Sequence, residues 1–221
     1  MNSLNFDEDY YERGVETHKS GYTDYHYMPE RSYSEAVEIV RAFPDCNTIL
    51  DFGSAKGFLV HTLRQLGKDA YGQDISEYAV KNSYFRATSY LKIIHPCIFK
   101  GFADKPHPLK KYDLVMAKDV LEHIPVENVR DVLAYLREST EKYVFAVIPL
   151  GDNNLFRIRE YEVDVTHVTK KDEDWWIDMF NYAGLKIVNF SYSMGAIKEK
   201  WTSVFPYGNG FFVLKRLNMN G

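Results

Sequence analysis

Short apolar runs of strand length alternate along the chain with longer segments whose apolar residues recur at helical spacing. A strand is predicted at 48–52, and helical patterns follow at 58–66, 128–141 and 172–182. Alternation of strands with helices favours a parallel sheet that helices cover on both faces, so the predicted fold class is α/β and doubly wound. The further expected strands are 69–74, 97–99, 112–117, 143–149, 185–192 and 210–214, and the further expected helices are 35–43, capped by Ser34, and 77–90, capped by Ser76.

The first predicted strand leads into a turn of small residues with the pattern D-x-G-x-A-x-G, from Asp51 to Gly57, and a helix begins at about Phe58. Gly53 allows a sharp turn, and Gly57 lets the helix start close to a ligand. The free N–H groups at the start of that helix then face a bound polar group. This arrangement predicts a nucleotide-binding site.

The polar residues around the turn indicate which nucleotide binds. Neither the G-x-G-x-x-G pattern nor the Walker pattern of phosphate-binding loops is present. A carboxylate at Asp51 would repel a phosphate, whereas it suits an ammonium group and ribose hydroxyls. The second strand ends at Asp74, about 17 residues after the turn, where a carboxylate can accept both hydrogen bonds of a ribose diol. Asp51, Gly53, Gly57 and Asp74 together suggest S-adenosylmethionine rather than a dinucleotide.

Three motifs in this order resemble those of the seven-stranded class I S-adenosylmethionine-dependent methyltransferases. They are I-L-D-F-G-S-A-K-G at 49–57, G-Q-D-I-S at 72–76, and Y-D-L-V at 112–115 followed by D-V-L-E-H-I at 119–124. The resemblance covers residues 35–215 and implies a mostly parallel Rossmann-like sheet in the order 3-2-1-4-5-7-6, with the last strand antiparallel. The family's middle glycine is Ala55 here and its common cysteine is Ser54, so we expect the turn to persist with slightly less room. The alternative is a doubly wound domain that binds another nucleotide.

The resemblance also implies which residues contact the cofactor. The adenine would lie at the end of the third strand, where Asp104 would accept a hydrogen bond from its amino group and Ala103 would contact it; a plain loop carboxylate is the alternative for Asp104. Lys118 either contacts the methionine carboxylate or faces solvent. The implied cofactor residues are Asp51, Gly53, Ser54, Ala55, Gly57, Phe58, Asp74, Ile75, Ala103, Asp104 and Lys118.

Candidate catalytic residues follow the fourth predicted strand, where ligands gather in such sheets. Methyl transfer from a sulfonium needs alignment and a deprotonated acceptor, and a hydroxyl needs a base or a metal ion to lose its proton. If the segment from 119 onward is helical, Asp119, Glu122 and His123 share one face. Two carboxylates and an imidazole suit Mg²⁺, Mn²⁺ or Fe²⁺, and His167 could add a second imidazole.

The same spacing resembles the acidic-x-x-Glu-His set of two metal-dependent branches of the family. One is the ubiquinone-pathway O-methyltransferases, and the other is the enzymes that methylate the terminal ribose 2′-hydroxyl of small RNAs, which add a later histidine. This resemblance implies metal ligands at Asp119, Glu122, His123 and His167, with Asp119 in place of the usual glutamate. Metal-free relatives share Leu-Glu-His at this point, where it orders the helix and a loop. Without a metal, His123 or His167 is the candidate general base.

We expect one domain over 1–221 with a Rossmann-like core at 34–217. Residues 1–33 are rich in tyrosine without clear periodicity, and two interpretations stay open: a lid over the cofactor mouth, or an arm packed on the outside of the sheet or in a dimer contact. The 150–171 insertion has few core signals and exceeds a usual strand–helix connection, so we expect it to be functional or mobile on the substrate side. Trp175 and Trp176 are expected mainly in the core.

Composition narrows the classes of partner. The net charge of −4 over 221 residues gives no electrostatic footprint for duplex nucleic acid. The two cysteines predict neither a disulfide framework nor a thiolate metal site. Because no signal peptide or membrane-length apolar run is evident, we expect a cytoplasmic protein that does not enter a membrane, as a monomer or homodimer.

The insertion suggests the acceptor. It is polar and carries Arg157 and Arg159, which could hold a phosphate or carboxylate, while the tyrosine-rich arm could stack on sugar faces. D-V-T-H at 164–167, followed by a Trp-rich helix, resembles methyltransferases associated with glycan assembly. The first hypothesis is therefore O-methylation of a sugar hydroxyl on a glycan, nucleotide sugar or phosphorylated sugar. The alternatives are methylation of another small metabolite or an RNA end with a His general base, and a non-catalytic methyltransferase-like scaffold.

Overall fold

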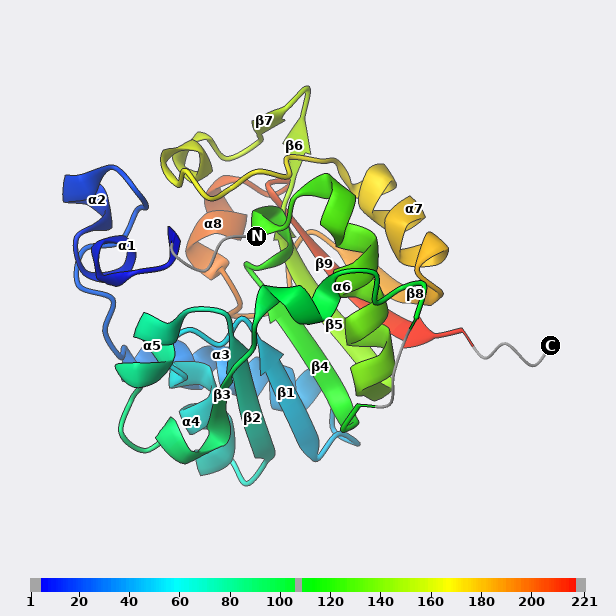
Figure 1. The fold of residues 1–221 in the computed structure, drawn as a ribbon, viewed down its shortest axis with the longest axis horizontal. Helices are drawn as coiled ribbons and strands as arrows, with labels where there is room; N and C mark the ends of the chain where they lie inside the picture. Colours follow the sequence, from blue (N-terminus) through cyan, green and yellow to red (C-terminus); the bar gives the residue numbers. More distant parts are fainter. Residues whose placement is uncertain (1–4, 106–108, 218–221) are drawn as a thin grey trace.

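The computed structural model describes residues 5–105 and 109–217. Seven strands form one sheet in the order β3-β2-β1-β4-β5-β9-β8 (Figure 1). Neighbouring strands from β3 to β5 are parallel, and β9 runs antiparallel to both β5 and β8. This confirms the predicted order, because β8 and β9 are the sixth and seventh strands of the sheet. The strands are β1 (Thr48–Phe52), β2 (Asp69–Asp74), β3 (Leu91–Ile93), β4 (Tyr112–Lys118), β5 (Thr140–Pro149), β8 (Leu185–Ser191) and β9 (Asn209–Arg216).

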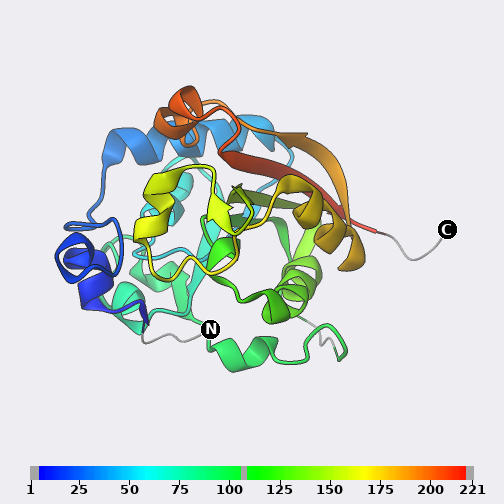
Figure 2. The same ribbon diagram turned by 90° about the horizontal axis from the view of Figure 1, so that it is seen from above.

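Helices cover both faces of the sheet (Figure 2). Successive residues of a strand point to opposite faces, so Ile49 packs on the side of α3 and α4, and Leu50 packs on the side of α6 and α7. Trp176 is fully buried in the second of these layers and Trp175 packs against it, which confirms their predicted place in the core. The helices are α1 (Glu8–Glu12), α2 (Gly14–Thr17), α3 (Pro29–Ala42), α4 (Phe58–Gln65), α5 (Glu77–Lys81), α6 (Val126–Ser139), α7 (Glu173–Tyr182) and α8 (Glu199–Val204).

Helix α3 begins earlier than the sequence pattern predicts. Its first residue is Pro29, whose missing N–H and fixed φ suit the first turn of a helix. Ser34 therefore lies inside the helix and does not cap it, and its hydroxyl donates to the carbonyl of Glu30. The predicted cap at Ser76 is confirmed, since its side chain accepts from the N–H of Ala79.

The third strand is the main error of the sequence prediction. It lies at β3, before the predicted 97–99 run, and Pro96–Phe99 forms a 3₁₀ turn instead. Pro96 has no N–H to donate to a sheet ladder, so the apolar residues after it coil onto the core. The helix predicted over 77–90 is also shorter: α5 ends at Lys81, and a separate 3₁₀ turn spans Thr88–Tyr90.

Three segments gather over the end of the sheet where the parallel strands finish. The N-terminal arm, here residues 5–28, carries α1 and α2, and the 150–171 insertion forms a small hairpin, β6 (Gly151–Asp152) with β7 (Leu155–Phe156), and a 3₁₀ turn at Arg159–Val163. The two segments meet where Val165 donates its N–H to the carbonyl of Lys19, 3.1 Å away (Figures 1 and 2). Helix α8, which the sequence pattern does not predict, is the third segment.

Across the described ranges, none of the helices has the length and apolar character that a bilayer crossing requires.

Candidate active site

A cavity of about 490 Å³ lies at the carboxyl ends of β1, β2 and β4. Its floor is formed by the loops that follow these strands, and its walls by the N-terminal arm, the 150–171 insertion and the start of α8. Carboxyl ends of parallel strands are where such sheets bind ligands. Most of the predicted cofactor residues line it: Asp51, Gly53, Ser54, Ala55, Phe58, Asp74, Ile75 and Lys118.

The turn after β1 has left-handed backbone at three positions. Gly53 and Gly57 have φ of 81° and 76°, and Ala55 adopts φ 47° despite its side chain. A Cβ on Gly53 would lie 2.3 Å from a methyl of Val120, so the chain needs glycine there for space as well as for backbone conformation. Gly57 lies at the N-cap position of α4, as the pattern predicts. The turn therefore keeps its shape with alanine at its centre.

Two buried aspartates face the cavity from the ends of neighbouring strands. Asp74 accepts from the N–H of Ala55 and from the N–H of Ser76, each at 2.7 Å, so its carboxylate joins the two loops. Burial raises the pKa of Asp51 to about 7, with Asp74 and Glu35 adding to the shift and Lys118 opposing it. A buried carboxylate with so high a pKa favours a cationic ligand group beside it.

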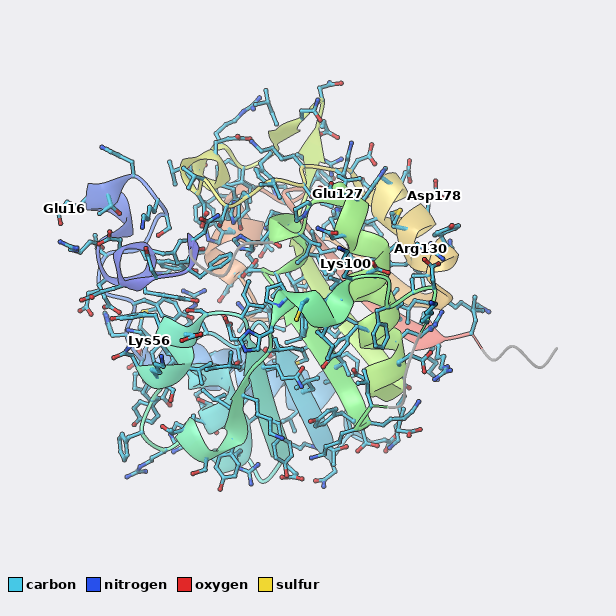
Figure 3. All side chains as sticks on the ribbon, viewed as in Figure 1. Glu16, Lys56, Lys100, Glu127, Arg130 and Asp178 are labelled. Atoms are coloured by element: carbon cyan, nitrogen blue, oxygen red, sulfur yellow. The ribbon has the colours of Figure 1, made fainter. Side chains whose placement is uncertain are left out.

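Ala103 and Asp104 lie outside the cavity. Asp104 is exposed and pairs with Arg130 at 2.7 Å, on α6, on the side of the molecule away from the N-terminal arm (Figure 3). The N–H of Ala103 donates to Asp131 on the same helix. Because β3 ends at residue 93 and not near 101, Ile94 lines the cavity in the place where the sequence puts these two residues.

Lys118 faces the cavity and not open solvent, with a side chain only 17% exposed. Its ammonium group lies 3.1 Å from Asp119 and 3.7 Å from Glu35, and these carboxylates raise its pKa. Arg31 bonds the other oxygen of Glu35 at 3.1 Å and also lines the cavity. Neither Arg31 nor Glu35 was predicted, because charged residues on an amphipathic helix give no signal of what they face.

Asp119 does not join the predicted histidine cluster. Its φ is 56°, and the following segment is a 3₁₀ turn at Leu121–His123, so positions 119, 122 and 123 do not share a helical face. The Asp119 carboxylate is held by Lys198 and Lys118, which keep its pKa well below its usual value. Lys198 comes from the start of α8, a segment that the sequence pattern left unassigned.

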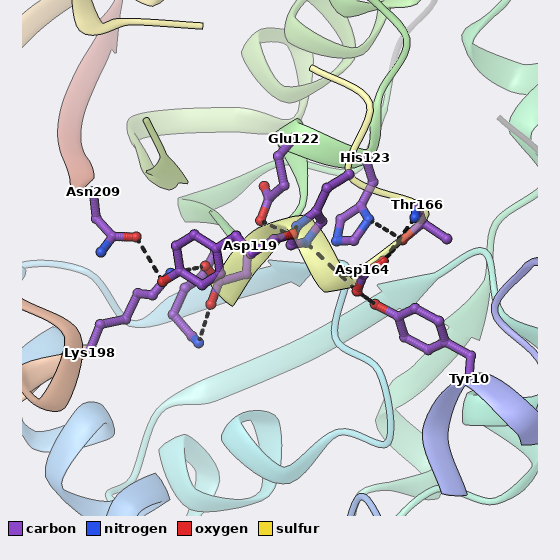
Figure 4. A network of polar contacts seen from close by, with 11 residues as sticks. Tyr10, Asp119, Glu122, His123, Asp164, Thr166, Lys198 and Asn209 are labelled. Carbon is purple, nitrogen blue, oxygen red and sulfur yellow. Dashed lines mark hydrogen bonds and ion pairs between the residues drawn. The ribbon is translucent and has the colours of Figure 1, made fainter. Parts of the chain in front are cut away.

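Glu122, His123 and His167 do come together, with potential ligand atoms that all lie within 4.8 Å of one another (Figure 4). The Glu122 side chain is fully buried, and neither of its oxygens has a hydrogen-bond partner among the residues described. Burial raises the pKa of Glu122, and the nearby Asp119 adds to the shift. An unpartnered buried carboxyl is costly, and both oxygens of Glu122 are available to a ligand.

Both imidazoles are held through Nδ1. His167 Nδ1 lies 2.8 Å from the carbonyl of Tyr161, which can only accept, so this nitrogen carries the proton. His123 Nδ1 lies 2.8 Å from the Thr166 hydroxyl, which donates to Asp164 and therefore accepts from the imidazole. Each Nε2 is left with a lone pair. Burial lowers the pKa of His123 to about 4, with His167 adding to the shift, and burial lowers the pKa of His167 as well.

The N-terminal arm contacts this cluster directly. Phe6 packs edge-on against the ring of His123 with centroids 5.4 Å apart, and the Tyr10 hydroxyl donates to Asp164 at 2.7 Å. The arm also bonds both loops that carry predicted cofactor residues, since Ser76 donates to the carbonyl of Phe6 and Lys56 pairs with Glu12. These contacts place the arm along the cavity wall, and its role as a lid stays a prediction.

Arg157 and Arg159 do not line the cavity. The Arg157 guanidinium is bonded by Asp152 and Glu173, so its charge is already compensated. Arg159 is exposed. The aromatic and basic lining on this side comes instead from Tyr161, Trp201 and Lys198.

Comparison with known structures shows the same architecture. The magnesium protoporphyrin IX methyltransferase ChlM from Synechocystis PCC 6803 with bound SAH is 16% identical with a TM-score of 0.63, over 97% of this chain and 100% of that one. A SAM-dependent methyltransferase from Archaeoglobus fulgidus is 18% identical with a TM-score of 0.58, over 83% and 94%. The mitomycin 7-O-methyltransferase MmcR is 14% identical with a TM-score of 0.58, over 84% of this chain and 54% of that one. The present chain thus spans about half the length of MmcR.

Comparison by sequence identifies the family. No curated protein matches the chain significantly. The sequence profile of a methyltransferase domain matches residues 25–189, which include the glycine turn, both cavity aspartates and the histidine cluster. The chain therefore belongs to the methyltransferase domain family, with the Rossmann-like sheet of the class I S-adenosylmethionine-dependent methyltransferases.

Proposed function

We propose that this protein transfers a methyl group from S-adenosylmethionine to a hydroxyl of a sugar. The observation that carries the proposal is one cavity with two functional ends. We name the lining after β1 and β2, with the glycine turn, Asp51 and Asp74, the donor end, and the lining by Glu122, His123 and His167, after β4 and in the 150–171 insertion, the acceptor end. A donor site beside a set of proton-accepting side chains is what methyl transfer to oxygen requires.

The first end suits the cofactor. Asp51 offers a carboxylate to the ammonium group of the methionine moiety, and Asp74 keeps lone pairs free for the ribose hydroxyls after accepting two backbone N–H groups. Ile75 and Ile94 give apolar surface next to Asp74, where we place the adenine. Arg31 and Lys118 are the candidates for the methionine carboxylate, because both are cationic and face the cavity.

The second end fits a divalent metal ion. Two neutral imidazoles with free Nε2 lone pairs and one unpartnered carboxylate are a donor set for Mn²⁺, Mg²⁺ or Fe²⁺. The carbonyl of Tyr161 and the Thr166–Asp164 pair hold the two Nδ1–H groups, as outer partners of ligating histidines commonly do. A bound ion would lower the pKa of an acceptor hydroxyl. We therefore propose Glu122, His123 and His167 as ligands, without Asp119, whose oxygens are taken by lysines.

The same side chains also support a reaction without a metal. His123 or His167 would accept the hydroxyl proton on Nε2, and the resulting oxygen would attack the methyl carbon. The carbon–sulfur bond then breaks, and its electron pair neutralises the sulfonium. Burial lowers the pKa of both imidazoles, so both are neutral at pH 7 and keep an Nε2 lone pair for the proton, as weaker bases than a free histidine.

The acceptor end favours a small polyol. Tyr22, Tyr161 and Trp201 present aromatic surface to the cavity, which suits the faces of a sugar ring. Lys198 is paired with Asp119, and Arg157 is bonded by Asp152 and Glu173, so neither charge is free for a phosphate and an unphosphorylated sugar is favoured over a phosphorylated one. Another small metabolite or an RNA end is the alternative acceptor. A cytoplasmic location and a monomer or homodimer stay predictions from the sequence.

Two measurements test the proposal. Calorimetry with S-adenosylmethionine should show binding at one site per chain, and absence of binding would leave only a scaffold role. Incubation with the cofactor and a panel of free sugars, oligosaccharides and sugar nucleotides, followed by mass spectrometry, should show a single added methyl on one class. Transfer only to metabolites without a sugar, or to RNA ends, would replace the acceptor assignment and leave the methyltransferase reaction in place.

A further inference from the structure

We propose that Tyr10 is a positioning residue, through which the N-terminal arm holds His123 in the orientation that presents its Nε2 to the acceptor end of the cavity. The inference rests on the proposed function and adds to it a residue from outside the methyltransferase sheet. Tyr10 lies on α1 and is only 4% exposed, so its hydroxyl is withdrawn from bulk water.

A directional chain of hydrogen bonds joins Tyr10 to His123 (Figure 4). The Tyr10 hydroxyl donates to Asp164 Oδ2 at 2.7 Å. The other oxygen, Oδ1, accepts from the N–H and the hydroxyl of Thr166. Because the Thr166 hydroxyl donates its one hydrogen to Asp164, it can only accept a hydrogen bond from His123 Nδ1, at 2.8 Å. The chain therefore fixes both the ring orientation of His123 and the nitrogen that carries its proton.

Within the described residues, Asp164 Oδ2 accepts a hydrogen bond from Tyr10 and from no second donor. Among the described residues, the further polar atom recorded near this oxygen is His167 Nε2 at 3.8 Å, beyond hydrogen-bond distance. Without the Tyr10 hydroxyl, Oδ2 has no donor within hydrogen-bond distance, so the carboxylate loses the bond that fixes its rotation relative to Thr166. His123 would then lose its fixed acceptor, and its ring would populate a second orientation or tautomer.

The position of Tyr10 is itself set by the cofactor loops. Ser76, next to the ribose-side Asp74, donates to the carbonyl of Phe6 at 2.6 Å. Lys56, inside the glycine turn, pairs with Glu12 at 2.5 Å. Phe6 and Glu12 flank Tyr10 in the same arm, so the donor end and the acceptor end of the cavity are joined through one short segment. Tyr10 thus links the loops that would hold the methyl donor to the imidazole that would act on the acceptor.

The test is the Tyr10→Phe variant of the full chain, which removes one hydroxyl and keeps the ring. We expect kcat to fall about tenfold, as for the loss of one hydrogen bond to a charged group, while the Kd for S-adenosylmethionine stays unchanged. ¹⁵N NMR of the His123 imidazole should show one Nδ1–H tautomer in the wild type and a mixture in the variant. The NMR readout needs no acceptor, so it distinguishes failure of this inference from failure of the proposed function.

Tyr27→Phe is the matched control, since this arm tyrosine also hydrogen-bonds, to Thr62 at 3.2 Å, but lies outside the cavity. It should leave kcat and the His123 spectrum as in the wild type. Thr166→Val removes the acceptor of His123 Nδ1 directly and should reproduce the mixed tautomer. Adding Tyr10→Phe to Thr166→Val should then cause no further loss of kcat. The proposal would be overturned if the losses of kcat in the two single variants multiplied in the double variant. An unchanged His123 spectrum in Tyr10→Phe would also overturn it.

Discussion

Asp74 accepts a hydrogen bond from the backbone N–H of Ala55 at 2.7 Å, so the proposed ribose ligand also fixes the centre of the glycine turn. Its second oxygen holds the N–H of Ser76, which caps α5. One carboxylate therefore organises both loops that carry the predicted cofactor contacts. A change at this position acts on the shape of the site as well as on the ligand.

Replacing Asp74 with Ala should lower the affinity for S-adenosylmethionine at least about tenfold and destabilise the fold by about 1–3 kcal/mol, because one buried and one partly buried N–H group lose their acceptor. Calorimetry measures the first effect and thermal unfolding the second. Asp74→Asn keeps one oxygen acceptor, so it should lie between the wild type and the alanine variant in both measurements. Wild-type affinity in Asp74→Ala would contradict the ribose assignment.

Cofactor affinity should rise with pH up to about 7 because of Asp51. Its pKa is raised from 3.8 to about 7 by burial, so in the free protein it is largely protonated below pH 7 and cannot pair with an ammonium group. The affinity should therefore fall about tenfold for each pH unit below 7. The same shift lowers the free energy of unfolding of the free protein progressively as the pH rises from 3.8 to about 7, and bound cofactor should offset that loss.

Asp51→Asn separates this effect from those of other buried acids. The amide carries no charge at any pH, so the variant should bind weakly and without the pH dependence between 5 and about 7 that Asp51 confers. Titration calorimetry of both proteins across this range gives the comparison. Parallel pH profiles for the two proteins would show that another group governs binding.

Ala55→Gly should stabilise the protein by about 0.5–1 kcal/mol. Ala55 adopts φ 47°, and left-handed backbone costs an L-residue about 1–2 kcal/mol, part of which is offset by the greater freedom of glycine in the unfolded chain. Denaturant unfolding measures the difference. Gly57→Ala is the opposite change at φ 76°, where the new Cβ would lie 2.7 Å from a methyl of Leu91, and it should destabilise. A less stable Ala55→Gly would mean that its methyl contributes packing that exceeds the strain.

The sheet and the cofactor end could be predicted because their signals are local. The pattern D-x-G-x-A-x-G after an apolar strand predicts a turn. Asp74 likewise marks the end of the second strand. Neither prediction needs information from distant residues. The prediction of the third strand is wrong because Pro96, directly before the predicted 97–99 run, begins a 3₁₀ turn that includes this run. Asp104 was misplaced as a consequence, since its position was inferred from that strand.

The proposed catalytic residues could be predicted only in part, because tertiary contacts decide which of them come together. The E-H pair and the later His167 were identified, but a helical spacing was assumed for a segment in which Asp119 has left-handed backbone. The lysine that removes Asp119 from the set, Lys198, lies 79 positions away in sequence. Likewise, no pattern in the tyrosine-rich arm indicates that Tyr10 reaches Asp164.

Mn²⁺ should bind the wild type and raise its thermal unfolding temperature, because it gives the unpartnered Glu122 carboxylate and the two Nε2 lone pairs their missing partner. Turnover should stop in EDTA and return with Mn²⁺ or Mg²⁺. Glu122→Gln keeps the shape of the side chain but removes a charged ligand. It should abolish the Mn²⁺-dependent shift while unfolding, without metal, at or above the wild-type temperature, since a buried amide costs less than a buried carboxylate.

Glu127→Gln is the control for that experiment, as this residue is exposed on α6 and its loss should leave the Mn²⁺ shift intact. One comparison then distinguishes the mechanism with a metal ion from the mechanism with a histidine base. If turnover persists in EDTA and Mn²⁺ shifts neither protein, the metal assignment fails and the imidazoles act as bases. In that case His167→Ala or His123→Ala should abolish turnover, whereas Glu122→Gln should retain most of it, because the carboxyl would no longer be a ligand. Loss of turnover in Glu122→Gln despite metal independence would contradict both mechanisms.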